Sequence, residues 1–217
     1  MSRSLPSGTD ALRQDLLLEV ITERYVVRDE PDEPEHDLGE IARHESAHAL
    51  TAALIFGPGS GSVALVEATP HHGRTQLAGT ILVAPGTAQR LRELATIALA
   101  GIAGDRLTGG PDAVSNGSAA DRTGATQYLI ELVGLGLTYD PASLESGGSS
   151  DRGSERMRAA LHAAVEAEGA NALERAIALL APHVAGIARL ATALLGTPGR
   201  TLSGAALEGA IRAALAE

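Results

Sequence analysis

The segment EIARHESAHALTAALIFG, residues 40–57, carries two histidines four residues apart, His44 and His48, with Glu45 directly after the first. On an α-helix, residues i and i+4 lie one turn apart on the same face, so both imidazoles can bind one ion. Glu45 projects about 100° around the helix from His44, beside such an ion rather than at it. A general base that takes a proton from metal-bound water must stand there. The spacing therefore predicts a catalytic zinc site.

A helix with two buried histidines and no metal would show the same spacing. In such a helix each inward-facing imidazole would need a hydrogen-bond partner or would destabilise the fold. This requirement favours the metal over the metal-free alternative. The chain has no cysteine, so any zinc site must use nitrogen and oxygen ligands.

A catalytic zinc needs a third protein ligand and an open fourth position. Asp121 is one candidate, because it follows Ser118 by three residues at the predicted start of a helix. There a carboxylate also completes a capping box, which keeps it ionised as a ligand must be. The pair His71 and His72, in a predicted turn, is the rival source of the ligand. The other histidines have no partner at metal spacing: His36, His162 and His183.

The elements that would position these residues are predicted to be mainly helices. Asp37, with Glu40 three residues on, should cap the helix that carries HExxH, and Gly57-Pro58 should end it. The residues at steps of three and four along this helix should point inward: Ile41, His44, His48, Ala52 and Ile55.

Elsewhere the patterns predict a small hairpin or sheet and further helices. Short β-type runs at 61–68 and 76–84 flank a turn-rich segment at 69–75. One helix should run from Thr87 to about Gly109-Gly110 and another from Ser118 to about Val133. The last three helices are expected at 153–168, at 171–195 with a kink at Pro182, and at 203–215.

Composition restricts the class of protein. Of the 217 residues 44% are apolar but only 2% aromatic, which is typical of closely packed small helices. The net charge of −10 argues against a nucleic-acid partner, and the absence of lysine excludes a Walker A loop. No uninterrupted apolar run approaches the roughly 18 residues of a membrane span, so we expect no membrane span and a cytoplasmic protein. Residues 1–37 read as an N-terminal helix (10–27) with an acidic linker, and 38–217 as the main domain.

Four segments in order resemble the peptidase domain of the FtsH family, the ATP-dependent membrane zinc proteases. HESAHALTAALIFGPGSGSVALV is similar to the zinc helix and following strand, and LATIALAGIAGDRLTGG to the helix after the small sheet. NGSAADRTGATQYLIELVGLG resembles the segment with the third zinc ligand. ALERAIALLAPHVAGIARLATALLGTPGRTLSGAAL is similar to the closing helices. The resemblance covers about residues 38–213.

The resemblance implies a mainly α, zincin-like metallopeptidase domain with a small sheet beside the HExxH helix. It makes His44, His48 and Asp121 the ligands of Zn²⁺ and Glu45 the general base. It also implies an extended polypeptide substrate, for which residues 77–84 would offer a strand edge.

The chain departs from the family in lacking its membrane anchor and ATPase, and in having Ala47 where the family usually has glycine. Gly124 likewise stands where the family tends to have a longer polar residue. We therefore expect an ATP-independent zinc endopeptidase acting on unfolded or flexible polypeptides. A separate unfoldase or adaptor and an oligomeric state are compatible with this expectation. The alternatives are a zinc-binding regulatory or interaction module without proteolysis, and a metal-free helical interaction domain.

Overall fold

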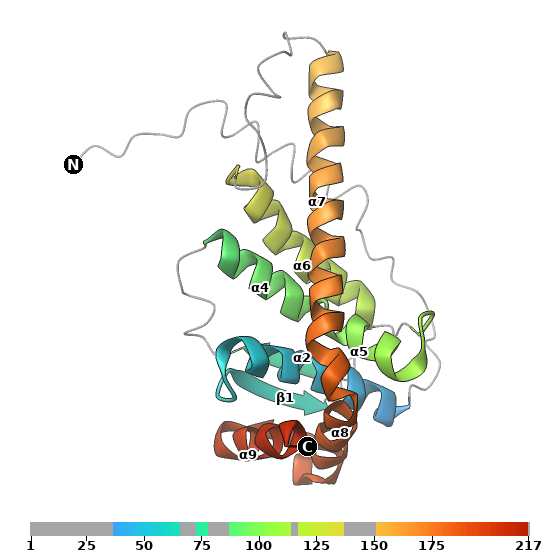
Figure 1. Ribbon diagram of the computed structural model, residues 1–217, viewed down its shortest axis with the longest axis vertical. Coiled ribbons are helices and arrows are strands. Elements are labelled where there is room, and N and C mark those ends of the chain that lie inside the picture. Colours follow the sequence, from blue (N-terminus) through green and yellow to red (C-terminus); the bar gives the residue numbers. More distant parts are fainter. Residues whose placement is uncertain (1–36, 66–72, 78–86, 114–116, 137–150, 217) are drawn as a thin grey trace, which may run out of the picture.

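The computed structural model describes residues 37–65, 73–77, 87–113, 117–136 and 151–216 (Figure 1). This part of the chain is mainly helical, as predicted, with one small antiparallel sheet. Its elements are α2 (Leu38–Phe56), β1 (Gly61–Leu65), β2 (Gly73–Leu77), α4 (Ala88–Ala98), α5 (Ala100–Gly109), α6 (Gly117–Gly134), α7 (Asp151–Leu180), the 3₁₀ turn η2 (Ala181–His183), α8 (Val184–Gly196), η3 (Pro198–Arg200), β3 (Thr201–Ser203) and α9 (Gly204–Leu215). The predictions for 1–36, His71, His72 and 78–84 lie outside the described residues.

Helix α2 begins and ends where the sequence predicts. The carboxylate of Asp37 accepts a hydrogen bond from the backbone N–H of Gly39 at 2.8 Å and so caps the N-terminus. At the other end Gly57 adopts φ +93°, a conformation that glycine reaches without a steric penalty. The predicted inward face is buried, with 3% of His44 and 7% of His48 exposed.

The sheet has the strand order β2-β1-β3, and both pairings are antiparallel. Strand β1 confirms the prediction for residues 61–65. The prediction of a turn at 73–75 is wrong, because these residues belong to β2 and pair with β1. Gly73 gives the segment a turn-like composition, and pairing with a neighbouring strand overrides that local preference. The sequence did not predict β3, since three residues are too few to show an alternating pattern.

The single helix predicted between Thr87 and Gly110 is divided in two. Its ends are confirmed: the Thr87 hydroxyl accepts from the N–H of Arg90 at 3.2 Å, and Gly110 ends the second helix with φ +100°. Between them Leu99 leaves the helical region (φ −94°, ψ 1°), so that α4 ends and α5 begins. No glycine or proline marks this break in the sequence.

Helix α6 begins at Gly117, one residue before the predicted cap. Ser118 therefore lies inside the first turn, and its buried hydroxyl has no hydrogen-bond partner among the described residues. The predicted capping role of Ser118 is wrong. The helix continues to Gly134, close to its predicted end.

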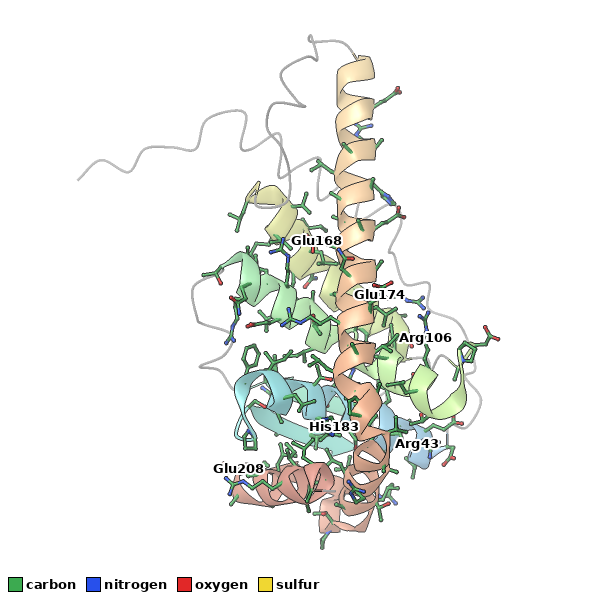
Figure 2. All side chains as sticks on the ribbon, viewed as in Figure 1. Arg43, Arg106, Glu168, Glu174, His183 and Glu208 are labelled. Atoms are coloured by element: carbon green, nitrogen blue, oxygen red, sulfur yellow. The ribbon has the colours of Figure 1, made fainter. Side chains whose placement is uncertain are left out.

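Helix α7 is one continuous element of 30 residues, so the predicted break between 168 and 171 is wrong. It packs along α4, α5 and α6, and the carboxylate of Glu168 holds the guanidinium of Arg92 on α4 with contacts of 3.0 and 3.2 Å (Figure 2). These contacts help α7 to continue as a helix across Gly169. The interruption predicted at Pro182 is confirmed, because α7 ends at Leu180 and the turn η2 leads into α8.

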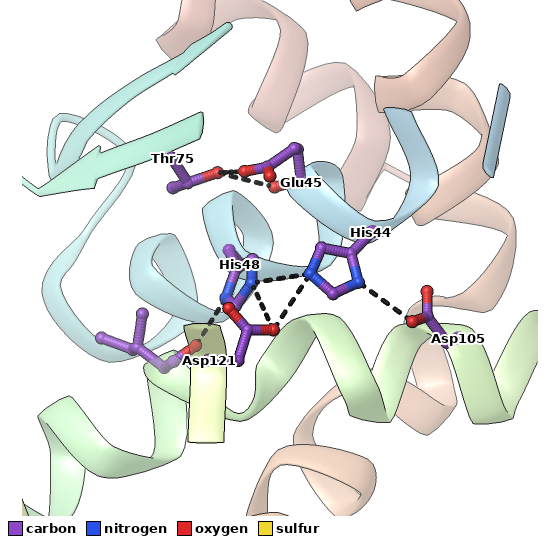
Figure 3. Close-up of polar contacts among 7 residues, drawn as sticks. His44, Glu45, His48, Thr75, Asp105 and Asp121 are labelled. Carbon is purple, nitrogen blue, oxygen red and sulfur yellow. Dashed lines mark hydrogen bonds and ion pairs between the residues drawn. The ribbon is translucent and has the colours of Figure 1, made fainter. Parts of the chain in front are cut away.

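Helix α2 lies at the centre of the fold. It packs against β1 and β2 on one side and against α5 on another, with α8 as a further neighbour (Figures 1 and 3). Ala42, Ala47 and Leu50 are fully buried along it. A methyl group added at Gly104 of α5 would overlap the Cβ atom of Ala47. The small residues thus let the two helices approach closely, as the composition predicts.

The stretch Arg158–Gly196 is long and apolar enough to cross a membrane, with a mean hydropathy of 1.6 in its most apolar window. Core helices of soluble proteins meet the same criterion, and a third of this window is buried inside the protein. Helix α7, which contains much of this stretch, packs on three other helices. The expectation that the chain has no membrane span stays a prediction.

Candidate metal centre

Three side chains from two helices converge on one point. The Nε2 atoms of His44 and His48, both on α2, lie 3.0 and 3.3 Å from Oδ2 of Asp121 on α6. The two Nε2 atoms lie 3.3 Å from each other (Figure 3). The three residues form a group that could hold a metal ion. The structure thus brings together the ligand candidates that the sequence named. Asp121 reaches the site although the predicted capping by Ser118 is not observed.

The spacing of the three donor atoms fits a tetrahedral ion. Nitrogen and oxygen ligands about 2.0–2.1 Å from a zinc ion lie roughly 3.3 Å from one another when the angles are tetrahedral. The observed separations of 3.0, 3.3 and 3.3 Å match this value. Three such donors leave one position of the tetrahedron for water or substrate.

The far side of each imidazole is held by an acceptor. Nδ1 of His44 donates to Oδ2 of Asp105 on α5 at 3.0 Å, and Nδ1 of His48 donates to the backbone oxygen of Ile97 at 2.7 Å. A neutral histidine with its proton on Nδ1 presents an unprotonated Nε2, the form that binds metal. Partners of this kind orient metal-binding histidines and raise their basicity. Both rings are therefore turned with their lone pairs toward Asp121.

This arrangement places three acceptors against one another unless a cation lies between them. Oδ2 of Asp121 is buried, and among the described residues no donor meets it in hydrogen-bond geometry, although both imidazoles lie within 3.3 Å. Without an ion, one of the Nε2 atoms must carry a proton to satisfy this oxygen. A buried acceptor without a donor is costly. These three ligand atoms therefore fit a bound cation.

The electrostatics of the metal-free site also call for positive charge. Burial alone would lower the pKa of His44, but the carboxylates of Asp105 and Asp121 raise this pKa to about 10. Burial likewise opposes the charged form of His48, yet Asp121 raises its pKa. Burial would raise the pKa of Asp121, whereas the two imidazoles hold that pKa well below its usual range. Without a metal, the site holds a proton in the place of the ion.

Two glycines give the donors their space. A Cβ atom at Gly101 of α5 would lie 2.5 Å from Nε2 of His48 and would overlap the ring of His44. A Cβ atom at Gly117, the first residue of α6, would lie 3.1 Å from Nε2 of His44. Real Cβ atoms essentially never come within 3.0 Å of another heavy atom. Gly101 therefore leaves open the space around the Nε2 atoms that a side chain would fill.

Glu45 lies on the sheet side of α2, away from Asp105 and the α5 helix (Figure 3). It is 7% exposed, and its Oε2 atom accepts a hydrogen bond of 2.6 Å from the hydroxyl of Thr75 on β2. Its charge contributes to raising the pKa of His48. Glu45 is therefore close enough to act electrostatically on the metal ligands without being one of them.

Two further histidines of the described part of the chain and Ala47 can also be placed. His162 pairs with Glu166 one turn along α7 at 3.3 Å, and His183 lies in the turn η2 between α7 and α8 (Figure 2). Neither belongs to the group that could hold a metal among the described residues. The methyl group of Ala47, where the family usually has glycine, is accommodated by Gly104.

Sequence reasoning missed Asp105, Ile97, Gly101 and Thr75. Of these, only Asp105 could have been suspected from the sequence, because a carboxylate is a common acceptor for the second ring N–H of a metal-binding histidine. Ile97 contributes a backbone oxygen, which any residue would supply. Its carbonyl lies in the last turn of α4, where it accepts from the N–H of Leu99 as well as from His48.

No protein-family model matches the chain, and a search of curated proteins finds no similar protein. The residues of the site are therefore the basis for assigning a function.

Proposed function

We propose that this protein is a zinc-dependent endopeptidase that hydrolyses peptide bonds in unfolded or flexible polypeptides. In this proposal the fold is a zincin-like peptidase domain related to that of the FtsH family. The observation that carries it is the convergence of His44, His48 and Asp121, with both Nδ1 atoms held from behind and Glu45 next to the first ligand.

Zinc fits this donor set better than magnesium or calcium does. Two imidazoles and one carboxylate, with separations of 3.0 to 3.3 Å, suit a four-coordinate ion. Magnesium and calcium prefer six or more oxygen ligands, which three side chains with two nitrogens do not provide. One position without a protein ligand is typical of catalytic rather than structural zinc sites.

When bound here, zinc would polarise the scissile carbonyl and make water more acidic. His44, His48 and Asp121 would hold the ion, while Asp105 and the carbonyl of Ile97 would fix the imidazoles in the tautomer that binds it. Glu45 takes a proton from the attacking water, whose oxygen forms a bond with the carbonyl carbon. As the C–N bond breaks, Glu45 gives that proton to the leaving nitrogen. The products are a carboxylic acid and an amine, which exchange a proton to give a carboxylate and an ammonium group.

Strand β2 is the proposed docking edge for the substrate. In the described part of the sheet β2 pairs with β1 on one side only. Because Thr75 of β2 contacts Glu45 directly, a polypeptide paired along this edge would pass close to the general base. Backbone hydrogen bonds would supply affinity with little dependence on side chains, which suits unfolded substrates.

The test combines zinc content with hydrolysis by the full-length protein. Elemental analysis of untagged protein should find about one zinc per chain. The protein should cleave a fluorescently labelled unfolded casein, and a chelator should prevent this cleavage. Glu45→Gln should keep zinc and lose cleavage, because the amide cannot accept the proton. Zinc binding without cleavage of any unfolded substrate would instead support the regulatory module. A chain that binds no zinc would contradict both.

A further inference from the structure

The hydroxyl of Thr75 is the one described side-chain group that hydrogen-bonds the carboxylate of Glu45. Its Oγ1 atom lies 2.6 Å from Oε2 of Glu45, a short distance typical of an O–H donor bound to an ionised carboxylate. The contact joins β2 to α2, since the two residues are 30 positions apart in the chain. In the described part of the chain the hydrogen bonds of the Thr75 hydroxyl go to Glu45 and to none of the three metal-ligand candidates.

We propose that Thr75 is a positioning residue, whose hydroxyl fixes the carboxylate of Glu45 in the place from which it acts on water. Glutamate has three rotatable side-chain bonds, and a carboxylate without a partner would sample several rotamers. Charge-assisted hydrogen bonds are the stronger ones in proteins. A single such bond, from a residue held in a paired strand, selects one orientation of the carboxylate.

The same hydroxyl has a second acceptor within reach. Oγ1 of Thr75 lies 3.1 Å from the backbone oxygen of Glu45. A hydroxyl carries one hydrogen and can rotate it between acceptors. The carboxylate can therefore leave Oγ1 during a reaction cycle while the hydroxyl turns to the backbone oxygen, so that the half-buried hydroxyl keeps an acceptor.

The position of Thr75 on β2 links this contact to the docking edge. Thr75 pairs with Val63 of β1, while the other side of β2 has no partner strand in the described part of the sheet. A polypeptide added along that edge would bond to the same strand that orients Glu45. This part of the inference rests on the proposed function, whereas the hold of Thr75 on Glu45 does not.

The first experiment tests the contact itself in chelator-treated, metal-free protein. A double-mutant cycle with Thr75→Val and Glu45→Ala measures the coupling between the two side chains in chemical denaturation. We expect the coupling to change the folding equilibrium about tenfold, the size typical of a hydrogen bond to a charged group. Additive effects of the two substitutions would overturn the inference, whether or not the protein binds zinc.

The second experiment tests the position of the carboxylate in zinc-loaded protein with acetohydroxamate. This probe binds zinc through two oxygens and passes its hydroxyl proton to a neighbouring carboxylate, so its affinity depends on where Glu45 lies. Thr75→Val should weaken its binding about tenfold and lower kcat for casein roughly ten- to a hundredfold with KM unchanged. Thr75→Ser, which keeps the hydroxyl, should restore both. Thr201→Val on β3, where the hydroxyl bonds only to the backbone oxygen of Gly199 in the described structure, is the matched control and should change neither.

The outcomes separate this inference from the proposed function. Unchanged acetohydroxamate affinity in Thr75→Val, or no restoration by Thr75→Ser, would overturn the positioning role. Loss of zinc from Thr75→Val would also overturn it, because Thr75 would then act on the metal site itself. If Thr75 controls the probe but wild-type protein cleaves no substrate, the positioning role is supported and the endopeptidase is refuted.

Discussion

Replacing Gly101 by alanine should weaken metal binding strongly. The added Cβ atom would lie 2.5 Å from Nε2 of His48 and would overlap the ring of His44. Ordinary contacts begin at 3.4 Å, so the imidazoles or helix α5 must move by about an ångström. Ligand atoms must stay within about 0.2 Å of their positions for a stable site. We therefore expect zinc affinity to fall at least about a hundredfold, since even changes beyond the ligands cost 10–100-fold.

The assay is a competition titration of zinc against a chelating dye, with thermal unfolding of the metal-free proteins measured in parallel. Gly124→Ala is the matched control, because it makes the same change on α6, three residues from Asp121, where a Cβ atom would meet nothing within 4 Å. This control should bind zinc normally and gain about 0.5–1 kcal/mol of stability, since alanine favours helix over glycine. Wild-type zinc affinity in Gly101→Ala would refute the arrangement of donors described above.

Three further predictions concern the same site. Asp121→Ala should lower zinc occupancy in elemental analysis well below that of wild type; retained occupancy would move the third ligand elsewhere, with His71 or His72 as candidates. Asp105→Asn should weaken zinc binding about 10–100-fold in the dye titration, because the carboxylate behind His44 is lost; an unchanged affinity would show that this contact does not tune the ligand. In metal-free protein the pKa of His44 is raised from 6.5 to about 10. The stability that this shift contributes to the fold is fully present below pH 6.5 and is lost as pH rises toward 10. Chemical denaturation should show this decline without zinc, and a flat profile over that range would contradict it.

Local features of the sequence were enough to predict helix α2 and its chemistry. Asp37 and Gly57 act through hydrogen bonds and backbone conformation within a few residues, so the ends of the helix could be predicted and were confirmed. The i, i+4 spacing places His44 and His48 on one face of any helix they occupy. The sequence also named Asp121, and the structure brings it to the two histidines.

Other elements were mispredicted where tertiary contacts outweigh local preference. Helix α7 passes through Gly169, although glycine disfavours helix, because it packs along three other helices. Residues 73–75 form a strand because β1 lies beside them. The helix break at Leu99 has no glycine or proline, and the carbonyl of Ile97 just before it accepts from both Leu99 N–H and His48.

The sequence by itself thus determined the candidate ligand pair, the general-base candidate and the helix that carries them, since these depend on spacing within one helix. Only the tertiary structure decided which groups surround them. Asp105 lies 61 positions from His44, and Thr75 lies 30 positions from Glu45. Gly101 matters through the space that it leaves open. Contacts at such separations follow from how helices and strands pack in three dimensions, and no local pattern of residues encodes that packing.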